Sequence, residues 1–452
     1  MSDNRRRAAN FAIRVSPNHY VTAIMLASFF GAFFLYLEWI SAGGAMLVLG
    51  FLILPFLAFT DRIAFDGRRL RRTGIIPRFW AWFNNYYFQL KISDIEQVET
   101  HSLRALKRGG NVFYRYRTAI SGRGLRFVIA SGGEEYRQMV REIFSRVPAD
   151  ILDNRSLELR DYLSEPKEVL MKAEFVHIPK ADVLEDALRE KRRSALRKPV
   201  SGDPAKAVEL RTLANELRLS GYLPQALEAF RRALVITPGD NWLLYEFARC
   251  LNSYAAAERN EKLSRRAFAS LRLVEKRVSD DGELLARVGE AYFQFGDWQR
   301  AQTAFQKSVE IIEESFRSAR GLAEIALREG KIAHVIHNFL TANRLAESPA
   351  LRRWTQNEAE YFSRLNDDEE YMEMEIGRIN LLETFERSKR SALRIAMLGM
   401  PVILVGMLLE DTLVANIGWA VAAISLVVWL AMIVAVNLFS SRIPTEMVAG
   451  EE

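Results

Sequence analysis

The chain has 452 residues, with 62 Lys and Arg against 56 Asp and Glu, and its only cysteine is Cys250. A single thiol excludes an intramolecular disulfide and any multi-cysteine metal site, and it fits a reducing compartment. The net charge of +6 is mildly basic, and the length predicts two or three folded units beside any membrane segments.

Four apolar stretches lie in two pairs near the ends of the chain. Each stretch is long enough, or nearly so, to cross about 30 Å of hydrocarbon as a helix. Links of three or four residues within each pair predict two helical hairpins, so everything between the pairs lies on one side of a membrane. The stretches are Val21–Leu37, Ala42–Phe59, Ile395–Leu409 and Leu413–Phe439.

Basic residues flank the outer ends of both hairpins, whereas the short links contain acids and no Lys or Arg. Because Lys and Arg beside a span stay cytoplasmic, we expect both termini and the whole middle in the bacterial cytoplasm, at the inner membrane. A cleaved signal peptide is disfavoured because a second apolar run follows at once. Pro55 and Pro401 leave open a hairpin that dips into one leaflet.

Residues 61–150 predict a small β domain. Val112–Arg117 and Leu125–Ala130 alternate as half-buried strands do. A helix starting at Glu134 follows, with an apolar face that includes Tyr136 and Val140. Residues 62–150 hold 17 Lys and Arg against 8 Asp and Glu. Without a nucleic-acid motif, this charge favours anionic lipid headgroups over nucleic acid as the partner.

This unit resembles the bacterial pleckstrin-homology-like domain. The resemblance rests on Phe65-Asp66-Gly67 with Leu70, on Ser93-Asp94-Ile95 with Val98-Glu99, and on the closing helix from Tyr136 to Val140. Members of that family often follow a pair of membrane spans. The resemblance implies a membrane-adjacent domain, and it leaves open whether the domain binds any ligand.

Two features of this unit are candidates for membrane-surface contact. One is a basic run, and the other is an aromatic run from Phe79 to Tyr87 that suits a headgroup belt. The basic run is first of all a topology signal, and we expect half of the aromatic run to fill the core of the β domain. The candidate residues are Arg68, Arg69, Arg71, Arg72, Trp80 and Trp82.

Residues 151–204 predict a linker that contains one helix at Val183–Leu188, with poor order from Lys191 to Pro204. Beyond it, a period of about 34 residues predicts pairs of helices. Small residues and turn glycines recur in the windows Ala207–Asp240, Asn241–Asp281, Gly282–Ser315 and Phe316–Pro349, the second with about seven extra residues.

This pattern resembles the tetratricopeptide repeat (TPR) and implies a superhelix over residues 205–392 whose groove binds protein partners. A fifth pair is expected to run straight into the third apolar stretch. Glu246 and Glu283 place acids where the carboxylate-clamp subset has Asn or Lys, which disfavours a clamp. The predicted groove residues are Arg211, Asn215, Arg218, Arg249, Arg287, Glu290, Phe293 and Gln294.

No constellation of catalytic residues is recognisable. The chain has no phosphate-binding loop, and His334 and His337, three residues apart, are more typical of helix packing than of a metal site. We therefore expect no enzyme activity, cofactor or metal.

The predicted organisation is a multi-domain membrane protein with four transmembrane helices, a β-rich domain and an all-α repeat superhelix. The segments are a basic N-terminus (1–19), hairpins at 20–60 and 393–440, the β domain (61–150), the linker (151–204), the repeats (205–392) and a tail (441–452). The function hypothesis is a membrane-anchored scaffold that recruits protein partners. The alternative is a structural subunit of a larger inner-membrane complex that handles envelope polymers or lipids, and homo- or hetero-oligomers remain open.

Overall fold

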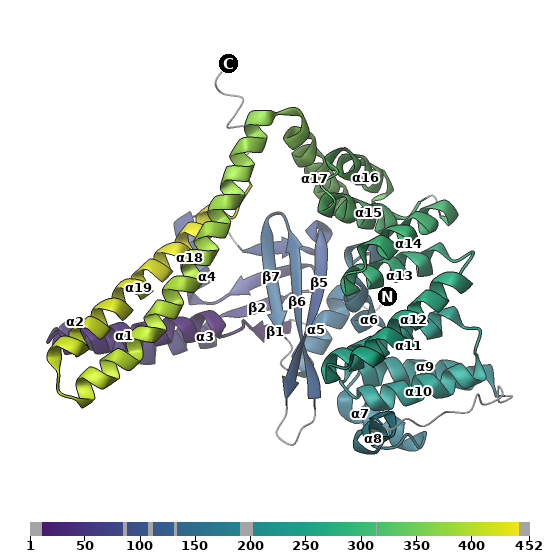
Figure 1. Cartoon of the computed structure of the whole chain (residues 1–452), viewed down its shortest axis with the longest axis horizontal. Helices are drawn as coiled ribbons and strands as arrows, with labels where there is room; N and C mark the ends of the chain where they lie inside the picture. Colours follow the sequence, from purple (N-terminus) through teal and green to yellow (C-terminus); the bar gives the residue numbers. More distant parts are fainter. Residues whose placement is uncertain are drawn as a thin grey trace, which may run out of the picture. The chain divides into compact units, whose positions relative to one another are not determined.

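The computed structural model describes residues 11–84, 88–106, 112–130, 133–189, 202–312 and 314–442. The chain divides into two compact units (Figure 1). The first, called the β-repeat unit, contains Met1–Ser16 and Thr60–Ala359. The second, called the apolar-helix unit, contains Pro17–Phe59 and Glu360–Glu452.

The apolar-helix unit contains four helices that are long and apolar enough to cross a membrane, among the residues described. The first is α1 (Asn18–Tyr36). The second is formed by α2 (Ile40–Val48), a π-helix (Leu49–Ile53) and α3 (Leu54–Thr60). The π-turn precedes Pro55, whose ring lacks an N–H and clashes with the carbonyl four residues earlier, so a wider turn relieves that clash. The other two helices are α18 (Glu369–Leu408) and α19 (Thr412–Phe439).

The α18–α19 hairpin is tightly packed through small residues. A Cβ atom added to Gly406 would lie 2.3 Å from the backbone nitrogen of Ala415, and one on Gly418 would lie 2.7 Å from that of Ile403. Only glycine allows so close a helix approach. The 40-residue length of α18 confirms that the helix of the expected fifth pair runs straight into the third apolar stretch.

The two hairpins also contact each other. The ring of Trp419 on α19 lies 5.2 Å from that of Phe29 and 5.6 Å from that of Phe33, both on α1. Nearby, the Tyr36 hydroxyl donates a 2.9 Å hydrogen bond to Asn416 Oδ1. The four helices therefore pack together in one unit.

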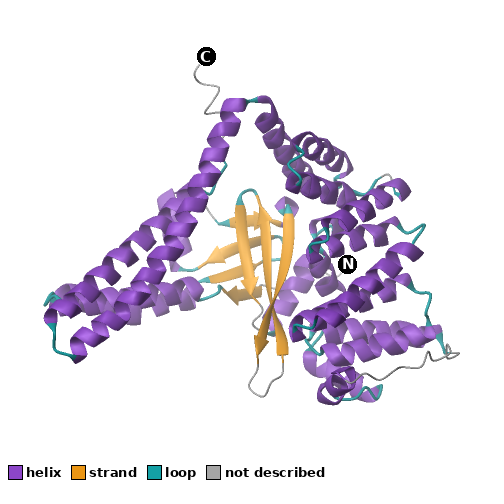
Figure 2. Ribbon diagram, viewed as in Figure 1, coloured by secondary structure: helices purple, strands orange, loops and turns teal. Residues whose placement is uncertain are grey.

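In the β-repeat unit, the described strands form two antiparallel sheets (Figure 2). We call these sheets, with α4 (Ile75–Asn84) and α5 (Glu134–Phe144), the β-domain. Phe65, Leu70, Ile120 and Val140 are fully buried in its core. One sheet holds β1 (Phe11–Arg14), β2 (Arg62–Phe65), β3 (Arg69–Thr73) and β4 (Gln89–Lys91), and the other holds β5 (Gln97–Leu106), β6 (Val112–Gly122) and β7 (Leu125–Ala130).

Two features of the β-domain were not predicted from the sequence. Strand β1 precedes α1 and pairs with β2, so the chain enters the domain before the first hairpin as well as after it. In the aromatic run, of which half was expected to fill the core, Phe79 and Trp82 are 62% and 79% exposed and do not belong to the core. The side chain of Trp80 lies outside the described part of the structure.

The segment predicted as a linker is mostly helical where it is described. It forms α6 (Asn154–Tyr162), α7 (Pro166–Phe175) and α8 (Ala181–Arg189), and α8 confirms the helix predicted at Val183–Leu188. Residues 190–201, which contain most of the stretch expected to be poorly ordered, lie outside the described part.

The repeats form pairs of antiparallel helices that match the four predicted windows. Asp240, Asp281 and Ser315 each begin a repeat by accepting a hydrogen bond from a backbone N–H in the first turn. The glycines between paired helices, such as Gly296 at φ +83°, take the left-handed conformation that ends a helix. The pairs are α9 (Pro204–Leu219) with α10 (Leu223–Ile236), α11 (Asn241–Glu258) with α12 (Glu261–Arg277), α13 (Gly282–Phe295) with α14 (Trp298–Ile311), and α15 (Phe316–Arg328) with α16 (Ile332–Leu345), followed by α17 (Pro349–Asp367).

Candidate functional site

The first helix of each repeat turns one face toward the β-domain. This groove face comprises the inward surfaces of α9, α11, α13 and α15, and the eight predicted groove residues lie on the first three of these helices. The structure shows what each of the predicted residues contacts inside the chain.

Helix α6 lies against the groove face through Glu158. One carboxylate oxygen of Glu158 accepts a 2.9 Å hydrogen bond from Arg218 Nη1 on α9, and the other accepts one from Arg249 Nη1 on α11. The side chains of all three residues are at least nine-tenths buried. A carboxylate between two guanidinium groups is the arrangement that makes burial of such charges tolerable.

The ion pairs extend along the groove face. Asn215 accepts a 3.0 Å hydrogen bond from Arg218 and donates one of 2.9 Å to Glu246, which also receives two bonds of 2.7 Å from Arg211. Four of the predicted groove residues therefore belong to one network that ends on Glu158. Glu246, the acid that departs from the carboxylate-clamp pattern, is the member that joins Arg211 to Asn215.

The two arginines determine the protonation of Glu158. Burial raises the pKa of its carboxyl group, but Arg218 and Arg249 outweigh burial, so the pKa lies below the ordinary glutamate value. A lowered folded-state pKa means that the contribution to stability is complete above the pKa of an unfolded glutamate. It is lost as the pH falls through the lower folded-state value.

Further contacts attach the β-domain to both ends of the repeats. At the first repeat, the buried Tyr116 hydroxyl of β6 donates a hydrogen bond to the Leu219 carbonyl. At the fourth repeat and beyond, Phe316, Ala319 and Leu351 belong to the same apolar cluster as the core of the β-domain. Arg353 of α17 lies 3.5 Å from the Asp94 carboxylate. The first and last parts of the repeat array are therefore packed on one domain.

A cavity of about 310 Å³ remains beside α6, where the groove face is not covered. The β-domain contributes Glu99 and His101 from β5, and the turn before α6 contributes Asp150 and Asp153. From the repeats come the predicted residues Glu290, Phe293 and Gln294, together with Arg317, Arg320, Gly321 and Glu324. Two structural elements that are far apart in sequence thus build one recess, which we call the composite cavity.

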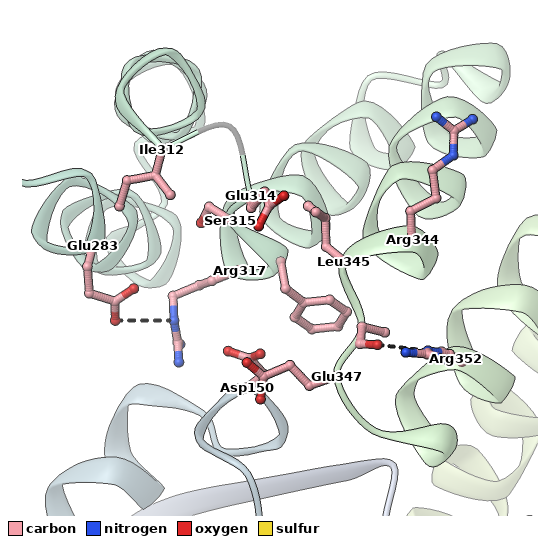
Figure 3. Close-up of a pocket in the computed structure, with 12 residues that line it drawn as sticks. Asp150, Glu283, Ile312, Glu314, Ser315, Arg317, Arg344, Leu345, Glu347 and Arg352 are labelled. Atoms are coloured by element: carbon pink, nitrogen blue, oxygen red, sulfur yellow. Dashed lines mark hydrogen bonds and ion pairs between the residues drawn. The ribbon is translucent and has the colours of Figure 1, made fainter.

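Arg317 lines both the composite cavity and a second recess of about 420 Å³, which Figure 3 shows. Its guanidinium donates to Glu290 and to the backbone carbonyl of Ala149, so it links α13, α15 and the turn before α6. Asp150 projects toward it from the β-domain side. Burial raises the pKa of Asp150, and Arg317 partly offsets that effect.

The remaining predicted residues lie apart from this site. Arg287 donates a 3.0 Å hydrogen bond to Glu283 and lies 5.4 Å from the centre of the Trp242 ring. Of the membrane-surface candidates, Arg72 pairs with buried Asp61 at 2.6 Å and Arg71 with Asp66 at 3.1 Å. Arg68 and Arg69 donate backbone N–H bonds to the Asp66 carboxylate.

Sequence analysis missed Glu158 on α6 and missed Asp150 and Asp153 in the turn before it. Asp150 was assigned to the end of the β domain, and the other two were assigned to a linker because a short helix with mixed charged and apolar residues has no recognisable period. The available signal was the pair Leu157 and Leu159 on either side of Glu158, which places a carboxylate among buried side chains.

No protein-family model and no curated protein matches the sequence. Several solved structures are similar to parts of the chain. MamA is 15% identical over 38% of this chain and 96% of its own, with a TM-score of 0.27. A thermophilic TPR protein of Thermus thermophilus is 18% identical over 43% of this chain and 98% of its own (TM-score 0.29). The protein pilF of Pseudomonas aeruginosa is 18% identical over 47% of this chain and 89% of its own, with a TM-score of 0.30.

At these TM-scores, the similarities have no bearing on function. The helix pairs themselves, with their 34-residue period and inter-helix glycines, define a TPR-like all-helical region. Stacked repeats of this kind present an extended concave surface, because each repeat adds a helix to it.

We expect Glu158→Gln to destabilise the full-length protein in detergent by about 3 to 5 kcal/mol at neutral pH, because it leaves two buried guanidinium groups without a counter-charge. Thermal unfolding measures this loss. The difference from wild type should shrink as the pH falls through the lowered pKa of Glu158.

The matched control is Glu261→Gln, which removes the acid of an exposed pair with Arg265. Its melting temperature should equal that of wild type, because exposed ion pairs contribute little. Equal melting temperatures for Glu158→Gln and the control would contradict the role assigned to Glu158.

Proposed function

We propose that this protein is a membrane-anchored scaffold that holds protein partners at the cytoplasmic face of the bacterial inner membrane. Four helices of sufficient length and apolarity support the anchor. Arginines outside the hairpins and acids at Glu38, Glu410 and Asp411 in the links support an orientation with both termini and both soluble domains in the cytoplasm.

The composite cavity is the observation that carries the proposal for partner binding. Glu158 and its arginines fill the part of the groove face contributed by α9 and α11, so a partner cannot enter there without expelling α6. The surface of α13 and α15 beside the cavity stays open, with Phe293 as an apolar contact and Gln294 as a hydrogen-bonding group. A partner segment would bind here and touch the β-domain and the repeats at once.

The β-domain is the second part of the proposal. A four-stranded and a three-stranded antiparallel sheet followed by the amphipathic helix α5 support the resemblance to bacterial pleckstrin-homology-like domains. We propose that this domain stays beside anionic lipid headgroups. Anchoring on a surface raises the effective concentration of anything bound to the repeats, and no new contact is required.

Photocrosslinking in cells tests partner binding. A photoreactive amino acid in place of Gln294 should capture discrete protein adducts, because this position lines the composite cavity. The control position is Arg272, which is exposed on α12, the second helix of its repeat, and lines none of the cavities described here. Adducts at Gln294 and none at Arg272 support the scaffold, whereas the same pattern at both positions contradicts it.

Replacing the four spans with foreign hairpins distinguishes the scaffold from a structural subunit of a membrane complex. Adducts at Gln294 that persist in such a variant support recruitment by the repeats. Adducts that disappear from a folded, membrane-bound variant indicate that the spans provide the interface.

Cysteine labelling from outside the cell tests the orientation. A membrane-impermeant maleimide should label a cysteine placed at Asp411 in the second link and should not label one at Lys206. Native Cys250 gives no background, because it is fully buried and burial raises the pKa of its thiol to about 12. Labelling at Lys206 in intact cells would contradict the proposed topology.

A further inference from the structure

Helix α4 has its apolar side facing outward. Ile75, Ile76, Phe79 and Trp82 are 44%, 41%, 62% and 79% exposed, and their spacing places them on one helix face. The opposite face holds Pro77 and Ala81, which are buried. Small residues therefore pack α4 on the rest of the β-domain, and the large apolar residues of the helix project away from it. A water-facing helix has the reverse pattern.

The backbone places the start of α4 beside the end of a candidate span. A Cβ atom added to Gly74, the residue before α4, would lie 3.1 Å from both the Thr60 carbonyl oxygen and Asp61 Cα. Thr60 is the last residue of the candidate span Ile40–Thr60. If that helix spans a bilayer, α4 begins at the depth where the helix leaves the membrane.

Backbone contacts of the residues before the first candidate span support the same placement. Val15 donates a 3.2 Å backbone hydrogen bond to the Asp61 carbonyl, and Arg14 pairs with Arg62 in the sheet. The first candidate span starts at Asn18, three residues after Val15. The chain thus enters one span and leaves the other at the same edge of the β-domain, and Gly74 adjoins that edge.

The charge near α4 suits an anionic surface. Helix α4 contains Arg78 and no acidic residue, and Arg62, Arg68 and Arg78 are all exposed. Trp, Phe and Ile beside Arg are the side chains that insert between headgroups, with the apolar groups directed to the acyl chains and the cations to lipid phosphates.

We propose that α4 lies in the plane of the inner leaflet, with Ile75, Ile76, Phe79 and Trp82 inserted at the boundary of headgroups and acyl chains of an anionic membrane. This inference rests on the proposed membrane anchor and deepens it. The helix is a second attachment that fixes the β-domain on the bilayer surface, and lipid covers its apolar face.

Lipid quenching of a fluorophore tests the proposal in the full-length protein. Phe79→Cys is made in a Cys250→Ala background, labelled with an environment-sensitive dye, and reconstituted in phosphatidylcholine–phosphatidylglycerol vesicles with shallow spin-labelled lipid. The dye should lose most of its fluorescence, and a dye at Trp82→Cys should behave alike, so one poorly folded variant does not decide the result.

Two control positions distinguish a failure of this inference from a failure of the proposed membrane anchor. Phe175→Cys on α7 changes another well-exposed phenylalanine, outside the β-domain, and should keep its fluorescence. Leu52→Cys lies inside the second candidate span and should be quenched, more strongly by deep than by shallow spin labels.

If Phe79 and Trp82 behave like Phe175 while Leu52 is quenched, the interfacial helix is wrong and the anchor stands. A blue-shifted dye at Phe79 that lipid does not quench indicates cover by protein, such as a second copy, and also overturns the proposal. If Leu52 is not quenched, the anchor itself fails, and the inference fails with it.

Discussion

The burial of one carboxylate between two arginines is the interaction on which the rest of the structure depends. Glu158 belongs to a nine-residue helix that is too short to be stable alone. Its contacts with Arg218 and Arg249 hold that helix against two successive repeats. Removing a single partner would leave an uncompensated buried charge, so the three residues must persist together. Together with the shared apolar cluster, these contacts hold the β-domain and the repeats in one compact unit.

This interaction divides the groove face into a part that α6 covers and a part that it leaves uncovered. The surface of α9 and α11 is used internally, and the surface of α13 and α15 remains beside an open cavity whose far wall is the β-domain. A partner bound there, as we propose, would contact a surface that neither the repeats nor the β-domain forms alone. The chain also contributes strands to the β-domain both before and after the first hairpin, because β1 precedes α1 and pairs with β2.

The sequence predicted the features that depend on local pattern. Apolar runs of sufficient length gave the four helices, and the 34-residue period gave the repeat pairs, because both signals repeat along neighbouring residues. Continuity of α18 followed from a polar helix that leads directly into the apolar stretch from Ile395, and Pro401 lies inside the helix.

Features that depend on distant partners were not predictable. The four residues of β1 pair with a strand on the other side of a hairpin, and Glu158 finds Arg249 across 91 positions. The sequence did not decide which half of the aromatic run fills the core, because a high local content of aromatic side chains does not say which medium each of them faces. Arg218 and Arg249, predicted as groove residues, find their partner Glu158 in a segment taken for a linker, whereas Arg211 and Asn215 bond to Glu246 on the neighbouring repeat.

Hydrogen exchange in the full-length protein tests the central claim most directly, because it reports whether α6 is held in the groove in solution. The interaction of Glu158 with its arginines predicts that the amides of Asn154–Tyr162 exchange as slowly as those of strand β7, which lies inside the β-domain. Exchange of α6 amides within the shortest labelling time, with β7 still protected, would show that the helix is free and the groove open, and would contradict it.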